Sequence, residues 1–357
     1  MELLSVTMND GVKPRSEIEG KDNSSEDKSN YKIVRKGDMV YNSMRMWQGA
    51  NGISPCDGIV SPAYTVLMPK QEINNGYFAA LFKSVTLINE FRKNSQGMTS
   101  DTWNLKYPQI ETIKVQIPSV SEQDKVSELF SVLDERIATQ AQLVESLKKY
   151  KRGVVRTLLS PKHCKLKNVE WTTAKIGDIG TFIKGAPLSK EDISSDGTPF
   201  ILYGELYTTY NEVISKVVRK TQASVDKQYY SQIGDVIIPT SGETPEEIST
   251  ASCVMLPDII LAGDLNIYRC TQVDGRIMSY ILNHVVNDRI ARVAQGKSIV
   301  HVQATEISKI EITYPDLISQ KKLIETFDAI TARIDQSMRE LELLQVHRKA
   351  LLQQLFI

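Results

Sequence analysis

A long internal repeat runs through this chain: residues 37–158 recur with nearly constant spacing at residues 234–355. Gly37-Asp38 is matched by Gly234-Asp235, 197 positions later, and the same offset joins further anchors toward the ends of the two copies. There are only two copies, and each is far longer than the unit of a solenoid protein. The repeat therefore predicts two similar bodies and a pseudo-symmetric molecule that meets its target at two places.

Each copy of the repeat ends in a stretch that is typical of a long helix. Apolar residues are spaced three and four apart, or at sums of these steps, and after its start no proline interrupts either stretch. The stripes are Val126, Phe130, Leu133, Ile137, Val144, Leu147, Val154 and Leu158, and then Leu323, Phe327, Ile330, Ile334, Leu341, Leu344, Leu351 and Leu355. A helix of about 40 residues is ~60 Å long.

Such helices need partners, because an isolated amphipathic helix leaves its apolar face in water. We expect the two helices to pair with each other as an antiparallel coiled coil. The pattern by itself also allows parallel pairing, and it allows each helix to pack only on its own domain.

The first part of each copy is globular and predicts short strands mixed with helices, which makes the fold class α+β. Expected strands are residues 38–42, 63–68, 110–117, 235–238, 266–270 and 306–313, and expected helices are residues 76–93 and 276–294. The two globular parts differ at their starts. The second begins near Trp171, and Leu3-Leu4 of the first aligns with Ile201-Leu202. The first therefore lacks about 27 residues, enough for one or two strands.

Motifs of catalysis are missing. The sequence has no His-Glu-x-x-His, no paired Cys/His set and no Gly-x-Gly-x-x-Gly, so we expect no metal and no cofactor. Gly296-Lys297-Ser298 resembles the end of a phosphate-binding loop, but Ala291 stands where that loop needs glycine. Four cysteines without a Cys-x-x-Cys pair predict reduced thiols and a cytoplasmic protein. No apolar run reaches ~18 residues, so no membrane contact is expected.

Net charge is zero, so any binding of DNA has to depend on local clusters of basic and amide side chains. In the first globular part the candidates are Lys13, Arg15, Asn42, Arg45, Asn104 and Lys106. In the second they are Lys184, Lys190, Arg219, Lys220, Lys297, His301 and Gln303.

A second group of cations lies on the helices. Lys148, Lys149, Arg152 and Arg156 stand near the end of the first helix, and Arg348 and Lys349 near the end of the second. Cations at a helix C-terminus are electrostatically ordinary. The functional alternative is docking onto another subunit.

The order of domain, helix, domain, helix resembles the specificity subunit of type I restriction–modification enzymes. The likeness covers almost the whole chain, and its doubled order carries more weight than any single motif. The motifs are the strand starts Gly37-Asp38 and Gly234-Asp235, the opening Ile176-Gly177-Asp178-Ile179 after Trp171, Ile117-Pro118 with Glu122-Gln123, Leu147-Lys148-Lys149, and the ending Arg348-Lys349-Ala350-Leu351-Leu352.

The resemblance implies two target-recognition domains, residues 1–118 and 161–317, each reading one half of a bipartite DNA site. Residues 119–160 and 318–357 would form two spacer helices, related by a pseudo-two-fold axis, that dock methyltransferase subunits, two in number. Restriction and translocase subunits would complete the assembly, and the subunit itself would be non-catalytic. The sequence departs from the family at its start, where the first recognition domain is incomplete. A coiled-coil scaffold with two protein- or ligand-binding domains, or a silent or truncated recombination cassette of the same family, would share this pattern.

Overall fold

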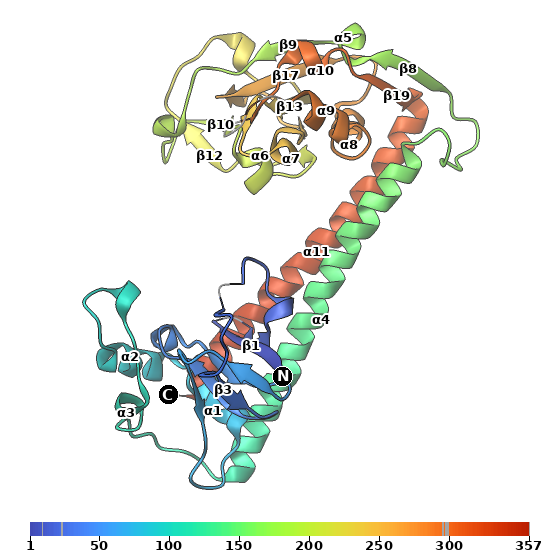
Figure 1. The fold of residues 1–357 in the computed structure, drawn as a ribbon. Coiled ribbons are helices and arrows are strands. Elements are labelled where there is room, and N and C mark those ends of the chain that lie inside the picture. The colour runs from blue at the N-terminus through green and yellow to red at the C-terminus, as the bar shows by residue number, and fades with distance from the viewer. Residues whose placement is uncertain (9, 23, 295, 297–299, 357) are drawn as a thin grey trace. The chain divides into compact units, whose positions relative to one another are not determined.

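The computed structural model describes residues 1–8, 10–22, 24–294, 296 and 300–356 (Figure 1). The chain divides into two compact units. The first unit comprises Met1–Leu143 with Ser337–Ile357, and the second comprises Val144–Gln336. The two 39-residue helices, α4 (Val120–Leu158) and α11 (Leu317–Leu355), are therefore each shared between the units. The long helices are confirmed, whereas the division into two domains and two separate spacers stays a prediction.

The globular part of the first unit combines short strands with short helices. Its strands are β1 Glu2–Thr7, β2 Gly11–Pro14, β3 Lys32–Val34, β4 Met39–Asn42, β5 Asn51–Ile53, β6 Gly58–Val60 and β7 Tyr64–Leu67. Its helices are η1 Arg15–Glu17, η2 Met46–Gln48, α1 Asn75–Leu81, α2 Val85–Asn94, η3 Ser100–Thr102 and α3 Tyr107–Ile110. The helix expected over 76–93 is thus two helices, α1 and α2.

The globular part of the second unit is larger. Its strands are β8 Trp171–Lys175, β9 Gly180–Lys184, β10 Thr198–Leu202, β11 Val213–Ile214, β12 Arg219–Thr221, β13 Asp235–Pro239, β14 Ser241–Gly242, β15 Ser252–Val254, β16 Ile260–Ala262, β17 Leu265–Cys270, β18 Val300–His301 and β19 Glu311–Pro315. Its helices are α5 Ile176–Ile179, η4 Lys190–Asp192, α6 Glu205–Thr208, η5 Lys227–Tyr229, α7 Pro245–Ile248, α8 Gly275–His284, α9 Asn287–Val293 and α10 Ala304–Ile307. Here too, the helix expected over 276–294 is two helices.

The two units share one pattern of strand pairing. In the first, β1 pairs antiparallel with β2 and parallel with β6, while β4 lies between β5 and β7. In the second, β10 pairs antiparallel with β12 and parallel with β16, while β13 lies between β15 and β17. The duplicated sequence therefore folds twice into the same mixed arrangement, and the fold class is confirmed. The pseudo-two-fold relation between the recognition domains stays a prediction.

The sheets of the two units differ at one edge. In the second unit β9 pairs with β17 and β8 pairs with β19. Among the described residues of the first unit no strand corresponds to β8 or β9, and the β5-β4-β7 sheet ends at β7. The strand expected over 110–117 is wrong, because this stretch is the end of α3 followed by a turn and then by chain without regular secondary structure. The equivalent stretch of the second unit forms β19 only by pairing with β8.

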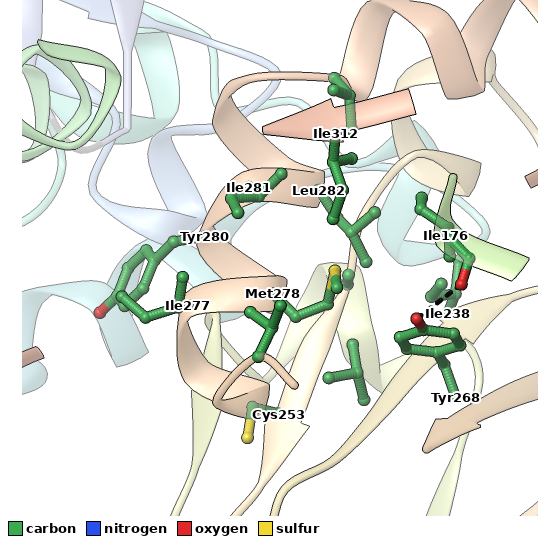
Figure 2. Packing of buried hydrophobic residues seen from close by; sticks show 14 of the residues in the cluster. Ile176, Ile238, Cys253, Tyr268, Ile277, Met278, Tyr280, Ile281, Leu282 and Ile312 are labelled. Atoms are coloured by element: carbon green, nitrogen blue, oxygen red, sulfur yellow. Dashed lines mark hydrogen bonds between the residues drawn. The ribbon is translucent and has the colours of Figure 1, made fainter. Parts of the chain in front are cut away.

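The largest core lies in the second unit, where α8 packs its apolar face against the central strands (Figure 2). Ile277, Met278 and Ile281 of α8 are fully buried together with Val236 and Ile238 of β13. Each such side chain contributes roughly 1.5–3 kcal/mol of burial free energy. This core fixes the positions of the loops that follow β13.

The first unit contains the start of α4 and the end of α11. In this unit the two helices run side by side (Figure 1). Gln140 donates to the backbone oxygen of Ser337, and Arg136 lies 3.6 Å from the carboxylate of Glu340. Closer to the start of α4, Asp134 forms an ion pair with Arg348. Positions therefore rise along one helix as they fall along the other, and the antiparallel pairing is confirmed in this unit.

A buried glutamine fixes the start of each long helix. In the first unit the side chain of Gln123 accepts a hydrogen bond from the backbone of Asn74 at 2.9 Å and donates to Pro118 at 3.0 Å. In the second, Gln320 does the same with Asp274 at 2.8 Å and Pro315 at 2.7 Å. In each glutamine the side-chain oxygen accepts one hydrogen bond and the side-chain nitrogen donates another. The same pair of contacts therefore fixes the direction of each helix relative to its own domain.

Candidate nucleic-acid interface

In the first unit, the loop after β4 lies against the segment that leads into α3. The backbone of Leu105 donates to Ser43 at 2.8 Å, and the rings of Trp47 and Trp103 meet edge to face at 5.1 Å. We call this surface the first junction; its side chains are Asn42, Arg45, Trp47, Trp103, Asn104 and Lys106. Four of the predicted DNA-binding residues of the first unit are therefore brought together, and Arg45 and Lys106 are exposed.

The second unit contains the equivalent place. The backbone of Val302 donates to Thr240 at 3.0 Å, the same bond as in the first junction displaced by 197 residues. His301 and Gln303 occupy the positions that Asn104 and Lys106 have in the first unit. The one-turn helix α10 follows Gln303, as the one-turn helix α3 follows Lys106. We call this surface the second junction; its side chains are Ser241, Glu243, Thr244, His301 and Gln303. Predicted residue Lys297 lies outside the described residues.

The electrostatics of the two junctions differ. The first presents Arg45 and Lys106 around a tryptophan pair. In the second, exposed Glu243 lies in the loop between β14 and α7, and β14 pairs with the strand of His301. Carboxylates repel phosphates but accept hydrogen bonds from the amino group of cytosine, whereas Arg and Lys donate to guanine. The second junction therefore suits contacts with base edges better than contacts with the backbone.

The remaining predicted residues of the second unit lie on elements other than those that form this junction. Lys220 and Arg219 lie on β12, and the backbone of Ser194, just after the η4 helix of Lys190, donates to Lys220 at 2.8 Å. Lys184 ends β9 and is exposed. Of these cations, Arg219 is already paired, with its Nε 3.2 Å from Glu205.

In the first unit, Arg15 is used within its own loop. Its guanidinium donates to the backbone oxygens of Ile18, Gly20 and Lys21 at 2.7–2.9 Å. These three bonds use three of its five N–H donors and tie Arg15 to the backbone of its own loop. Lys13, on β2, lies 3.6 Å from Asp10. Neither residue belongs to the first junction.

Of the basic residues predicted for subunit docking on the two long helices, some have partners within the part of the chain that the structure describes and others do not. Arg348 pairs with Asp134 and covers the ring of Phe130, and Arg156 donates to the backbone of His284 at 3.1 Å. Lys148 pairs with Glu145 of its own helix at 2.9 Å. Among the described residues, Lys149, Arg152 and Lys349 have no carboxylate within ion-pair distance and are exposed. This second set is the one available for docking.

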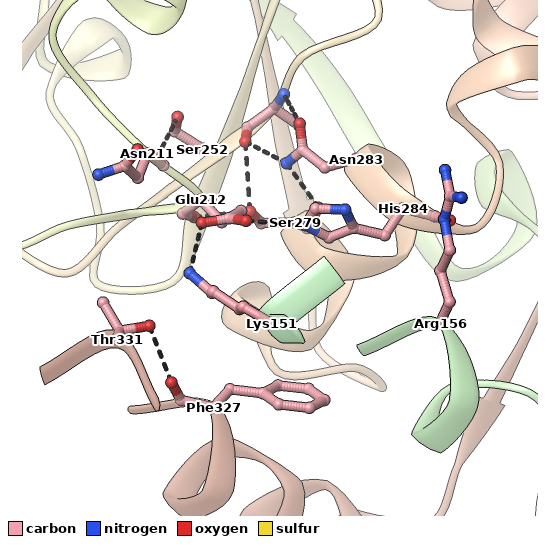
Figure 3. A network of polar contacts seen from close by, with 11 residues as sticks. Lys151, Arg156, Asn211, Glu212, Ser252, Ser279, Asn283, His284, Phe327 and Thr331 are labelled. Atoms are coloured by element: carbon pink, nitrogen blue, oxygen red, sulfur yellow. Dashed lines mark hydrogen bonds and ion pairs between the residues drawn. The ribbon is translucent and has the colours of Figure 1, made fainter. Parts of the chain in front are cut away.

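A buried ion pair in the second unit was not predicted from the sequence (Figure 3). Lys151 of α4 lies 2.8 Å from Glu212 and 5.2 Å from the centre of the Tyr280 ring, and Glu212 also contacts His284 at 2.7 Å. Burial would raise the pKa of Glu212, but the hydrogen bond from His284 and the Lys151 charge outweigh it and hold the pKa at about 2. Lys151 sits in a run of surface cations, so its burial left no signal in the sequence.

This lowered pKa predicts a loss of stability in acid. Glu212 titrates at about 2 when folded against an ordinary value of 4.5, so the unfolded chain binds the extra proton first. Its contribution is complete above pH 4.5 and is lost as pH falls from there toward 2, by about 3 kcal/mol in total. Urea unfolding of the second unit at stepped pH should show this decline, and Glu212→Gln should flatten it. Parallel pH curves for both proteins would rule out the assignment.

Comparisons with known proteins agree on one family. A family model described as "Type I restriction modification DNA specificity domain" matches residues 5–149 and 168–345. The type I restriction enzyme MjaVIII specificity subunit of Methanocaldococcus jannaschii is 21% identical over 347 residues, which cover 90% of this chain and 78% of that protein.

Two solved structures share the fold. The type I restriction–modification S subunit from M. genitalium has a TM-score of 0.56 at 16% identity, covering 91% of this chain and 84% of that one. A chain from a structure that concerns complex assembly and conformational transition of the type I system has a TM-score of 0.60 at 15% identity, with coverage of 92% of this chain and 83% of that one.

None of the described helices is long and apolar enough to cross a membrane.

Proposed function

This chain belongs to the type I restriction–modification DNA specificity family, and we propose that each of its two junctions reads one half of a bipartite DNA site. As a member it is a DNA-recognition subunit. The observation that supports the finer proposal is the repeated junction, in which the same backbone bond holds candidate base-reading residues in both units. The first junction presents Arg45 and Lys106, whereas the second presents Glu243 and His301. Because these side chains favour different bases, the two half-sites should differ in sequence.

We further propose that the chain is non-catalytic and works in a complex with modification and restriction subunits. The exposed cations Lys149, Arg152 and Lys349 support docking of two modification subunits on the helices. A net charge of zero fits this division, because partner subunits would supply most of the phosphate contacts.

Lys106→Ala tests the reading role of the first junction. In a complex assembled with the modification subunits, we expect specific DNA affinity to fall about tenfold, which corresponds to the loss of one base contact. Binding to non-specific DNA should change far less. Affinity for the mapped target and for a target altered in one half-site can be measured by fluorescence anisotropy at fixed salt.

Lys36→Ala is the matched control, since this exposed lysine lies before β4, at the end of the strand opposite to the junction. It removes the same charge and should weaken binding less than about twofold. Equal losses in the two variants, on specific and non-specific DNA alike, would count against base reading by Lys106. Partner binding that is indifferent to DNA would favour a scaffold instead.

A further inference from the structure

A methionine at the tip of one loop of the first unit is almost completely exposed. Met98 is 99% exposed, more than any other large apolar side chain among the described residues. Single exposed apolar residues are common on proteins, so exposure alone assigns no role. The position of Met98 is more informative, because its loop, residues 96–104, ends at the first junction with Trp103 and Asn104.

The loop is held in one shape by its own hydrogen bonds. The backbones of Gln96 and Asn104 bond to each other twice, at 3.0 and 2.8 Å, and close the loop at its base. The backbone of Thr99 donates to the Thr102 hydroxyl at 3.1 Å, and that hydroxyl donates to the Thr99 oxygen at 2.9 Å. Gly97 has a φ of +149°, and a Cβ there would lie 2.6 Å from the backbone oxygen of Thr102. The tip is two residues from Gln96 and therefore within about 8 Å of the closed base.

Cations of the first junction lie beside the base of the loop. Arg45 and Lys106 are exposed members of the junction. Arg92 of α2 is exposed as well and lies over the Trp47 ring, 5.9 Å from the ring centre. The loop itself carries one acid, Asp101. Positive charge at the base suits the phosphates of a duplex, whereas a carboxylate near the tip is repelled by them. The tip therefore suits a base step better than the backbone.

We propose that Met98 is an apolar wedge that enters a base step of the duplex at the half-site read by the first junction. This inference rests on the proposed function. Methionine is among the side chains with which DNA-bending proteins part a base step, and burial of its apolar surface offsets part of the cost of unstacking. Steps of a pyrimidine followed by a purine unstack most readily, so the half-site should hold one of them opposite the loop.

The wedge belongs to the first unit alone. In the sequence, Gln295-Gly296-Lys297 matches Gln96-Gly97-Met98, so a lysine stands at the matching position of the second copy. A cation is drawn to phosphates, and an apolar side chain is not. The proposal therefore predicts unstacking in one half-site only.

Oxidation of methionine measures the contact directly. In a complex assembled with the modification subunits, dilute hydrogen peroxide converts exposed methionines to the sulfoxide, and mass spectrometry follows each of them. The mapped target should slow oxidation of Met98 at least about tenfold, because an inserted thioether is shielded from solvent, and non-specific DNA should slow it far less. Met68 is the internal control. It is 83% exposed and follows the end of β7 that pairs with Met39, whereas the junction lies at the other end, with Asn42.

Variants at the same position separate an apolar wedge from a polar contact. Met98→Ala and Met98→Gln should each weaken binding to the mapped target about tenfold, and Met98→Leu should keep it within about twofold. Because the side chain is 99% exposed, none of the three should change the melting temperature. No charge is removed, so the dependence of affinity on salt should stay the same. Met68→Ala is the matched control and should leave affinity unchanged.

A fluorescent adenine analogue, which brightens when it loses its stacked neighbours, locates the step. It is placed in turn along the half-site, except at the base that is methylated, because methyltransferases extrude their target base. We expect brightening at one step, and Met98→Ala should abolish it.

The outcomes distinguish this inference from the proposed function. If the complex prefers its mapped target but Met98 oxidises equally fast with and without it, or if Met98→Ala binds as tightly as the unchanged protein, the wedge is wrong and base reading by the junction stands. Protection of Met98 in the complex before DNA is added would overturn the proposal and assign the loop to a partner subunit. A complex without preference for its mapped target would overturn both.

Discussion

Replacing Lys151 by methionine will destabilise the second unit by about 3–5 kcal/mol, the cost of removing one partner from a buried ion pair. The Lys151 side chain is only 9% exposed, and its ammonium neutralises Glu212. Without it the carboxylate stays buried with His284 alone. Trp171 is the only one of the three tryptophans in the second unit, so its fluorescence in a Trp47→Phe, Trp103→Phe background reports urea unfolding of that unit.

Lys149→Met is the matched control for this substitution. Lys149 stands two residues away on the same helix but is exposed, so its replacement should change stability by less than about 0.5 kcal/mol. Adding Glu212→Gln to Lys151→Met should recover much of the loss, because a neutral pair needs no compensating charge. If Lys151→Met and Lys149→Met unfold at the same urea concentration, the ion pair does not hold α4 in this unit.

Phe130→Ala will destabilise the first unit by about 3–5 kcal/mol, the usual cost of truncating a buried aromatic side chain. Phe130 is 4% exposed and stacks on Phe356, with ring centres 6.0 Å apart. The ring also lies under the guanidinium of Arg348, and Phe356 in turn meets Tyr77 at 5.4 Å. Truncation therefore opens a cavity where α4, α11 and α1 meet. Unfolding followed through Trp47 and Trp103 measures the effect.

The neighbouring residue supplies the comparison for Phe130. Leu129 is 44% exposed on the same helix, so Leu129→Ala removes apolar surface without opening a cavity and should cost below about 1 kcal/mol. Leu and Phe differ in helix propensity by less than about 0.7 kcal/mol, which is small beside the expected loss, so the difference between the two variants chiefly measures packing. A Phe130→Ala protein as stable as Leu129→Ala would show that the two helices are held together elsewhere.

The sequence predicted the candidate site unevenly, and particular residues explain why. Asn42, Arg45, Asn104 and Lys106 come from two distant stretches, yet they meet at one junction. The second junction could have been found from the 197-residue offset applied to the first, since His301 and Gln303 answer to Asn104 and Lys106. Arg15, Arg219 and Arg348 looked equally available in the sequence. Each is occupied by partners that only the folded loops or helices bring near.

By itself the sequence determined that the chain is duplicated and that each copy ends in a helix of about 40 residues. Periodicity and spacing are local properties, so these features can be read without coordinates. Only the tertiary structure decided which cations are free, that Lys151 is buried, and that residues 114–118 form no strand. These outcomes depend on partners far away along the chain, because a strand needs a neighbouring strand and a charge is buried only where an opposite charge meets it.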